Sequence, residues 1–69
     1  MRDPNRLDKY YEQLCELHKK HCPDWRMGQL MYNFLSWHVQ NYGDPFFPED
    51  AEFNKRIKEF FKDTMNVPF

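Results

Sequence analysis

Apolar residues recur three and four positions apart in three stretches of the chain, a spacing typical of amphipathic helices. The first stretch predicts a helix over roughly residues 4–21. Its apolar side consists of Leu7, Tyr10, Tyr11, Leu14 and His18. Asp3 is a natural N-cap, and Pro4 suits the first helical position, which needs no amide hydrogen. Pro23 ends this helix, because a residue that precedes proline is disfavoured in the α region.

The second stretch predicts a helix over roughly residues 25–42, with Asp24 as its N-cap and Gly43 as a left-handed stop. Its apolar stripe consists of Met27, Leu30, Met31, Phe34, Leu35, His38 and Tyr42. The opposite side is polar but uncharged, and it consists of Gln29, Asn33, Ser36 and Gln40. Such an amide-rich side is either a contact surface or a merely solvated one.

The third stretch predicts a helix over roughly residues 50–63, with an apolar side formed by Phe53, Ile57, Phe60 and Phe61. Acidic residues lie at its start and basic residues follow, which suits the helix dipole. Glu52 and Arg56 form a well-oriented pair four residues apart. Strands favour β-branched residues, and these are scarce here. We therefore expect an all-α, compact three-helix bundle, with residues 1–69 forming one domain.

The charge balance limits the classes of partner that the chain is expected to bind. The 69-residue chain carries 10 Lys and Arg against 11 Asp and Glu, a net charge of -1, which argues against nucleic-acid binding driven by counterion release. The longest uncharged stretch, residues 27–43, contains too many polar residues to span a membrane. The start of the chain has no apolar signal core. Two cysteines are too few for a disulfide framework, so a cytoplasmic location is expected.

A metal site is conceivable around Cys15, His18, His21 and Cys22 of the first helix and His38 of the second. Zinc needs four ligands in a tetrahedron. Two helical turns spread the Cα atoms of Cys15, His18 and Cys22 over roughly 10 Å, which prevents easy convergence. These residues are better explained as core and helix-end positions. We expect no metal and no cofactor, and a metal-dependent protein is the weakest hypothesis.

Catalytic groups are also scarce. Ser36 is the only serine, and it lies about 200° around the helix from His38, which excludes that histidine as its base. With Gly28 and Gly43 as the only glycines, no phosphate-binding loop can form. We therefore expect no enzymatic activity, and no small-molecule substrate is evident.

Aromatic residues make up 19% of the chain, its most unusual feature. Five of them are difficult to place inside so small a core: Tyr32, Trp37, Phe46, Phe47 and Phe69. Two explanations remain open. Large rings fill a small bundle efficiently, or some form an exposed patch for another protein or for a second copy.

Two sequence boxes carry a resemblance. The segments 23–30 (PDWRMGQL) and 44–50 (DPFFPED) resemble a family of short uncharacterised bacterial and phage-associated proteins with a PDxRxGQL box and a DPFFxED box. The resemblance covers the middle of the chain best. It implies no activity, cofactor or ligand set, and neither box contains Cys15 or Cys22.

The boxes admit a structural and a functional interpretation. In the structural one, Gly28 allows a close approach of another segment, Phe46 and Phe47 close one end of the core, and Arg26 reaches Glu49 or Asp50. In the functional one, polar residues of the boxes share a recognition surface with nearby aromatic residues. That candidate interaction surface consists of Arg26, Gln29, Tyr32, Trp37, Asp44, Phe46, Phe47 and Glu49.

The sequence thus favours a small non-enzymatic helical module that binds an unidentified protein partner or associates with itself. The alternative is a nucleic-acid-associated regulator that uses the third helix through Lys55, Arg56, Lys58 and Lys62. Acidic residues alternate with these basic ones, which is more typical of a solvated face.

Overall fold

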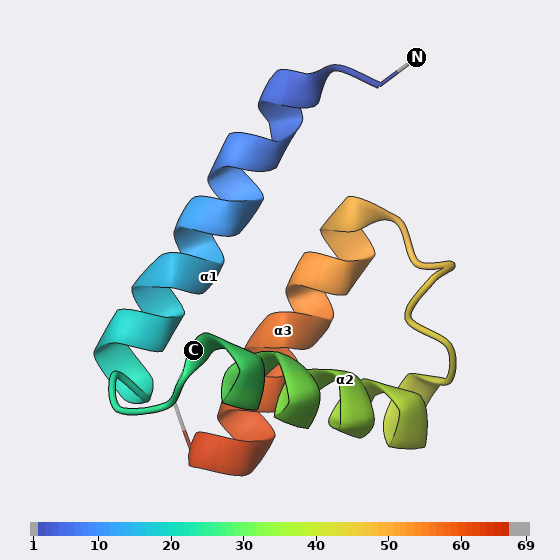
Figure 1. Cartoon of the computed structure of the whole chain (residues 1–69). Helices are drawn as coiled ribbons and strands as arrows, with labels where there is room; N and C mark the ends of the chain where they lie inside the picture. The colour runs from blue at the N-terminus through green and yellow to red at the C-terminus, as the bar shows by residue number, and fades with distance from the viewer. Residues whose placement is uncertain (1, 67–69) are drawn as a thin grey trace.

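The computed structural model describes residues 2–66 and shows three helices (Figure 1). Helix α1 spans Leu7–His21 and follows a short 3-10 turn at Pro4–Arg6. Helix α2 spans Met27–Tyr42, and helix α3 spans Asp50–Met65. The all-α, three-helix fold predicted from the sequence is confirmed.

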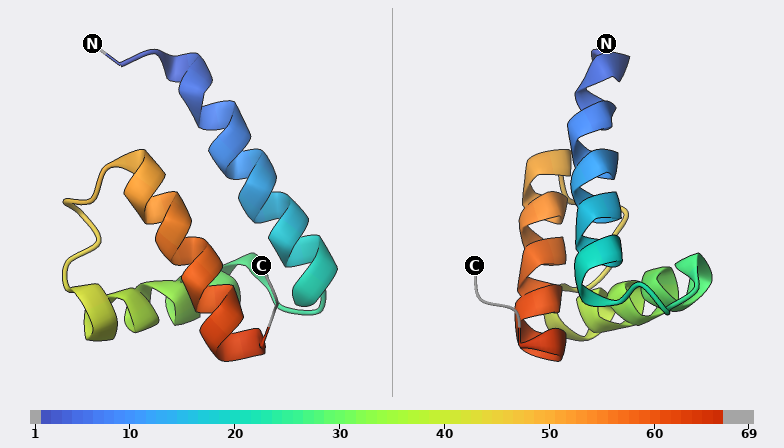
Figure 2. Two further views of the ribbon diagram at one scale, coloured as in Figure 1. Left: turned by 180° about the vertical axis from the view of Figure 1, so that it is seen from behind. Right: turned by 90° about the vertical axis from the view of Figure 1, so that its left-hand side faces the viewer.

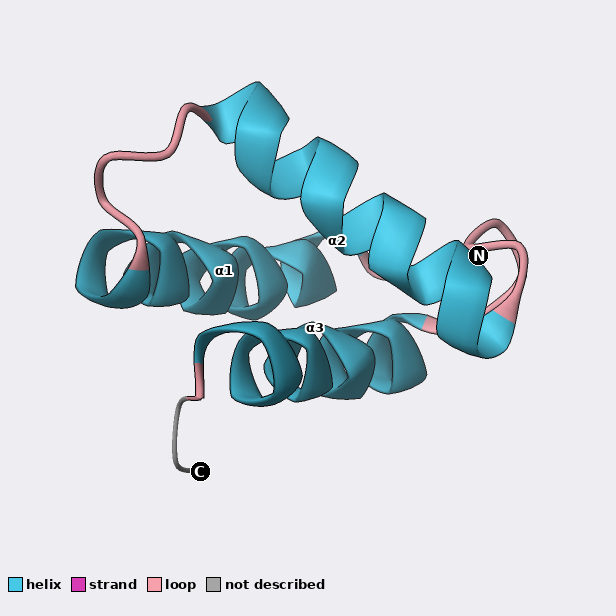
Figure 3. Ribbon diagram, turned by 90° about the horizontal axis from the view of Figure 1, so that it is seen from below, coloured by secondary structure: helices cyan, strands magenta, loops and turns pink. Residues whose placement is uncertain are grey.

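Helix α3 is the element that the other two share. Helices α1 and α3 lie side by side and run in the same direction, and α2 crosses their C-terminal halves (Figures 1 and 2). The view from below shows α2 lying across the pair (Figure 3). The main contacts between helices join α2 to α3 and α1 to α3. The apolar stripes of α1 and α2 are therefore both buried chiefly against α3.

The core is small and rich in aromatic rings. Its buried members are Leu17, Cys22, Leu30, Phe34, Ile57, Phe60 and Phe61. The ring of Phe34 meets the rings of Phe53 and Phe60 edge-on, with centroids 5.2 and 5.6 Å apart. Edge-to-face contacts of this kind add to the burial of apolar area. Part of the high aromatic content is thus explained by large rings that fill the core, which is the first of the two explanations left open above.

Polar contacts align the N-terminal halves of α1 and α3. Arg6 Nε lies 2.7 Å from a carboxylate oxygen of Asp50, and Arg2 pairs with Glu49 at 2.7 Å. These pairs correct the expectation that Arg26 reaches Glu49 or Asp50. The parallel course of α1 and α3 brings the start of α1, rather than the start of α2, to these two acids. The Arg2–Glu49 pair is exposed and contributes little stability, whereas the Arg6–Asp50 pair is partly buried. Both pairs fix the orientation of the two helices.

The helix ends agree with the sequence in part. The Asp3 side chain accepts a hydrogen bond from the amide of Asn5, as expected of a cap. Asp24 does not cap α2, because the chain first turns through Trp25, whose N–H donates to Cys22 O at 3.0 Å. The N-cap is Arg26. Gly43 ends α2 with a positive φ of 92°, although its ψ of -150° lies outside the left-handed helical region.

Within residues 2–66, none of the helices combines the length and apolar character needed to cross a bilayer.

Candidate functional site

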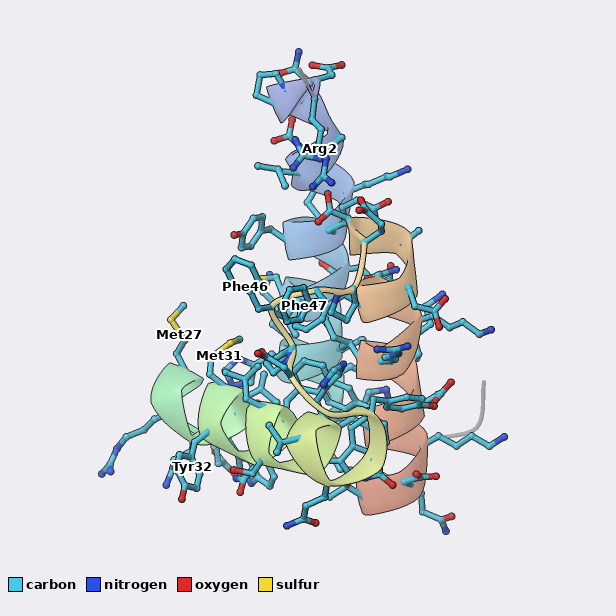
Figure 4. All side chains as sticks on the ribbon, turned by 90° about the vertical axis from the view of Figure 1, so that its right-hand side faces the viewer. Arg2, Met27, Met31, Tyr32, Phe46 and Phe47 are labelled. Carbon is cyan, nitrogen blue, oxygen red and sulfur yellow. The ribbon has the colours of Figure 1, made fainter. Side chains whose placement is uncertain are left out.

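Large hydrophobic side chains remain on the surface around α2 and the loop that follows it. We call this set the apolar face, and it consists of Met27, Tyr32, Leu35, Val39, Phe46 and Phe47. Phe46 is 83% exposed, Phe47 75% and Tyr32 74%. Figure 4 shows Phe46 and Phe47 above α2, Met27 and Met31 on its upper side, and Tyr32 below it. The exposed side chains therefore form two groups on opposite sides of α2, with Phe46, Phe47 and Met27 on one side and Tyr32 on the other.

The loop of residues 43–49 holds its two phenylalanines outward. A side-chain oxygen of Asp44 accepts a hydrogen bond from the Phe46 amide at 2.9 Å, which is an Asx turn. The rings of Phe46 and Phe47 meet edge-on with centroids 5.2 Å apart. The expectation that they close one end of the core is therefore wrong, because the turn directs both rings into solvent.

The base of this loop is anchored in the core. His38 is fully buried, and its Nδ1 lies 2.9 Å from the carbonyl oxygen of Gly43. The aromatic rings of Phe34, Phe53 and Tyr42 surround the imidazole at 5.6 to 6.0 Å between centroids. The exposed phenylalanines thus extend from a backbone that is held at its start.

The outer side of α2 carries a seam of residues with helix-packing spacing. Tyr32, Leu35, Ser36 and Val39 stand at positions i, i+3, i+4 and i+7, and together with Gln40 they line a shallow hollow. Ser36 is the small residue in this hollow. No residue from Met27 to Gly43 carries a formal charge at pH 7 with histidine neutral. This uncharged seam adjoins the stripe that faces the core at Leu35, which also lines a small apolar cavity with Leu30 and Phe34.

A second apolar concavity lies between the helices. It is a groove of about 290 Å³ bounded by α1, α3 and Met31 of α2. Its apolar lining includes Leu7, Tyr10, Tyr11, Leu14, Phe53 and Ile57. Its polar lining includes Asp50, which is already paired with Arg6, and Asn54, which donates to Gln13. The groove therefore offers apolar surface and few free polar groups.

The sequence-predicted surface residues fall into three groups. Tyr32, Phe46 and Phe47 belong to the apolar face. Trp37 lies partly buried against the core, where its ring contacts Phe34 and Phe60. Phe69, the remaining aromatic residue that the sequence left unplaced, lies outside the residues that the structure describes.

The polar candidates satisfy local backbone groups or an ion pair. The Arg26 amide donates to Gln29 Oε1 at 2.7 Å, Asp44 makes the Asx turn, and Glu49 pairs with Arg2. The structure does not join these residues into one recognition site. Sequence reasoning assigned Met27 to the core stripe, although it is 73% exposed, and did not include Val39 in the surface. Leu35, also assigned to the core stripe, contacts both the core cavity and the seam. The spacing of Tyr32, Leu35, Ser36 and Val39 was the signal that could have revealed the seam.

The potential metal ligands are dispersed. His18 Nε2 donates to the Trp25 carbonyl at 2.7 Å, and His38 is occupied as described above. Cys15 is exposed and Cys22 is buried, both as free thiols. Burial raises the pKa of the Cys22 thiol, which disfavours the thiolate that a metal binds. No group of three or more His, Cys, Asp or Glu side chains within residues 2–66 is arranged to hold a metal ion.

The basic residues of α3 are not equivalent. Arg56 turns inward: its guanidinium lies over the Tyr42 ring at 4.1 Å from the centroid, and its side chain is only 17% exposed. It also pairs with Glu52 at 3.5 Å, as the i,i+4 spacing predicted. Lys55, Lys58 and Lys62 remain exposed. Arg56 therefore cannot serve as a free phosphate contact on this helix.

Comparisons of the chain with protein-family models, with curated proteins and with solved structures give no match.

Proposed function

We propose that this chain is a small non-enzymatic helical module that binds another protein chain through its apolar face. The observation that carries the proposal is the exposure of Tyr32, Phe46 and Phe47 beside an uncharged helix seam. Leaving such rings in water forgoes the free energy of burying apolar area. Large apolar side chains that gather in water around one helix and its following loop commonly mark an interaction site.

Two further features support a binding role. The loop that presents Phe46 and Phe47 is anchored through His38 and Gly43, which reduces the entropy lost when the rings are immobilised. Aromatic residues are also enriched among the residues that contribute most to protein–protein binding. The alternative, nucleic-acid binding through α3, has less support because Arg56 is engaged by Glu52 and Tyr42.

The test compares two charge insertions on α2. Val39→Glu places a carboxylate in the apolar face, and Asn33→Glu places one on the exposed polar side of the same helix. Immobilised wild type, Val39→Glu and Asn33→Glu are incubated with extract of the native host, and captured proteins are compared quantitatively. We expect wild type and Asn33→Glu to retain the same protein and Val39→Glu to lose at least ~10-fold of it. Equal capture by all three variants would refute the proposal.

A further inference from the structure

The seam on α2 has a symmetry that bears on the identity of the partner. Residues of its outer side stand at positions 28, 32, 35, 36, 39 and 43. These positions are arranged symmetrically about the midpoint between Leu35 and Ser36: position 32 lies as far from it as position 39, and position 28 as far as position 43. Two copies of α2 packed antiparallel about a two-fold axis at that midpoint would therefore place seam residues against seam residues along its whole length.

The residue sizes agree with this register. Leu35 of one copy meets the small Ser36 of the second copy, and Tyr32 meets the second copy's Val39. Gly28 meets the end of the second copy's α2, where Gly43 follows the helix, so that the two backbones can approach closely at both ends. Interdigitation of large and small side chains in this way is how helices pack together.

Gly28 has no explanation within a single copy. It lies in the first turn of α2, where a Cβ added to it would meet nothing within 4 Å. The expectation that another segment of the same chain approaches Gly28 is therefore wrong. Glycine lowers helix stability relative to alanine, and a helical glycine facing solvent on an apolar seam is accounted for by the close approach of a second helix.

The charges also favour a second copy. A charged residue near a two-fold axis meets its own like charge, which destabilises self-association. The seam avoids this problem, because residues 27–43 contain no Asp, Glu, Lys or Arg. The net charge of -1 adds almost no repulsion between whole copies. The surface is thus compatible with itself, and it offers no charge complementarity to an acidic or a basic partner.

The apolar area of the seam is that of a weak dimer. Tyr32 is 74% exposed, Val39 55% and Leu35 38%, which together leave on the order of 300 Å² of apolar surface per copy. Ser36 and Gln40 extend the seam with polar surface. This area is below the ~800 Å² per partner of a standard stable interface and is typical of a weak, transient one.

We infer that the chain forms a two-fold symmetric homodimer in which the α2 helices pack antiparallel along residues 28–43. This inference rests on the proposed function, since it names a second copy as the protein that covers the α2 seam of the apolar face.

The experiment is sedimentation equilibrium of the full chain from about 5 µM to about 500 µM, the weaker end of the affinity range of such interfaces. Wild type is expected to shift from monomer to dimer within this range. Ser36→Arg places two like charges beside the axis and is expected to weaken dimerisation at least ~100-fold. Asn33→Arg, a matched charge on the polar side of α2, is expected to change it less than ~3-fold.

Gly28→Ala provides a second test that does not depend on inserting a charge. Alanine favours the helix of the monomer, yet its Cβ would separate the two backbones, so dimerisation is expected to weaken about 10-fold while helicity measured by circular dichroism does not fall. A wild type that remains monomeric at about 500 µM, or Gly28→Ala and Ser36→Arg variants that both dimerise like wild type, would overturn the homodimer.

The two proposals fail separately. A monomeric protein that still captures another chain through Val39 would refute the homodimer and leave the protein-interaction module intact. A monomeric protein whose captured proteins do not depend on Val39 would refute both.

Discussion

His38 on α2 and Arg56 on α3 meet inside the protein, with Nε2 of the imidazole 3.2 Å from Nη1 of the guanidinium. A guanidinium only donates, so Nε2 accepts and the ring proton resides on Nδ1. That proton is donated to the carbonyl oxygen of Gly43 at 2.9 Å. One neutral imidazole therefore connects the basic helix to the end of α2 and to the loop that displays Phe46 and Phe47.

Loss of the His38 side chain should destabilise the fold. His38→Ala removes a fully buried ring and leaves Arg56 with further unpartnered donors, in addition to Nε, which already has no partner within residues 2–66. We expect a loss of roughly 2–4 kcal/mol in the free energy of unfolding, measured by urea denaturation. His38→Asn can retain the donor to Gly43 and should lose less. Equal losses in the two variants would show that this hydrogen bond contributes nothing.

A better N-cap residue at the start of α2 should stabilise the protein. Arg26 is the N-cap and makes no side-chain capping hydrogen bond. Arg26→Ser supplies a hydroxyl acceptor for the first turn and should stabilise the protein by about 1 kcal/mol, which corresponds to a rise in Tm of about 4–8 °C. Asp24→Ala serves as the control, and we expect its Tm to stay within ~3 °C of wild type. A large fall in the Tm of Asp24→Ala would instead show that Asp24 caps α2.

Tyr42 should keep its proton to an unusually high pH. The hydrogen bond that it donates to Glu59, reinforced by desolvation and by the charge of that carboxylate, raises the pKa of the Tyr42 phenol above its ordinary value of 10.0. The pKa of Tyr42 is higher in the folded than in the unfolded protein. The stability that the hydrogen bond to Glu59 contributes is therefore complete below about pH 10 and is lost as the pH rises through the pKa of Tyr42 in the folded protein. Titration of tyrosinate absorbance checks it: Tyr42→Phe should remove the last transition, and Glu59→Gln should shift that transition to lower pH. An unchanged titration in Glu59→Gln would contradict the assignment.

The two thiols should react at very different rates. Cys15 is exposed, whereas Cys22 is buried and burial raises the pKa of its thiol. A thiol reagent under native conditions should therefore modify Cys15 at least ~10-fold faster. Cys15→Ser should leave only the slow phase, which becomes fast in urea. Two equally fast phases in the native protein would place Cys22 at the surface.

Matched substitutions at Phe46 and Phe60 separate surface from core. Phe60→Leu changes a ring that is 1% exposed and should lower the free energy of unfolding by on the order of 1–2 kcal/mol. Phe46→Leu changes a ring that is 83% exposed and should alter it by less than ~0.5 kcal/mol in dilute solution. Equal destabilisation would mean that Phe46 packs against its own chain.

The helical pattern was predictable because it depends on local spacing. The 3.6-residue period, the Asp3 cap and the stop at Gly43 are encoded within a few residues of where they act, and each is present in the structure. The start of α2 was placed two residues early, at Trp25, since a turn closed by the Cys22 carbonyl competes with the Asp24 cap.

The tertiary partners depended on helix orientation, which spacing does not specify. Arg26 was assigned to Glu49 and Asp50 because the two boxes begin successive helices. The parallel arrangement of α1 and α3 instead brings Arg2 and Arg6 to these acids. The same limit applied to Phe46 and Phe47, whose outward direction follows from the Asx turn at Asp44.

The position of α3 as the shared partner has a consequence for folding during synthesis. Helices α1 and α2 emerge from the ribosome first, yet the surface on which both are buried belongs to a helix made later. Short isolated helices are only marginally stable in water. The nascent chain therefore stays largely unstructured until α3 leaves the exit tunnel, and its tertiary structure then forms in one late step.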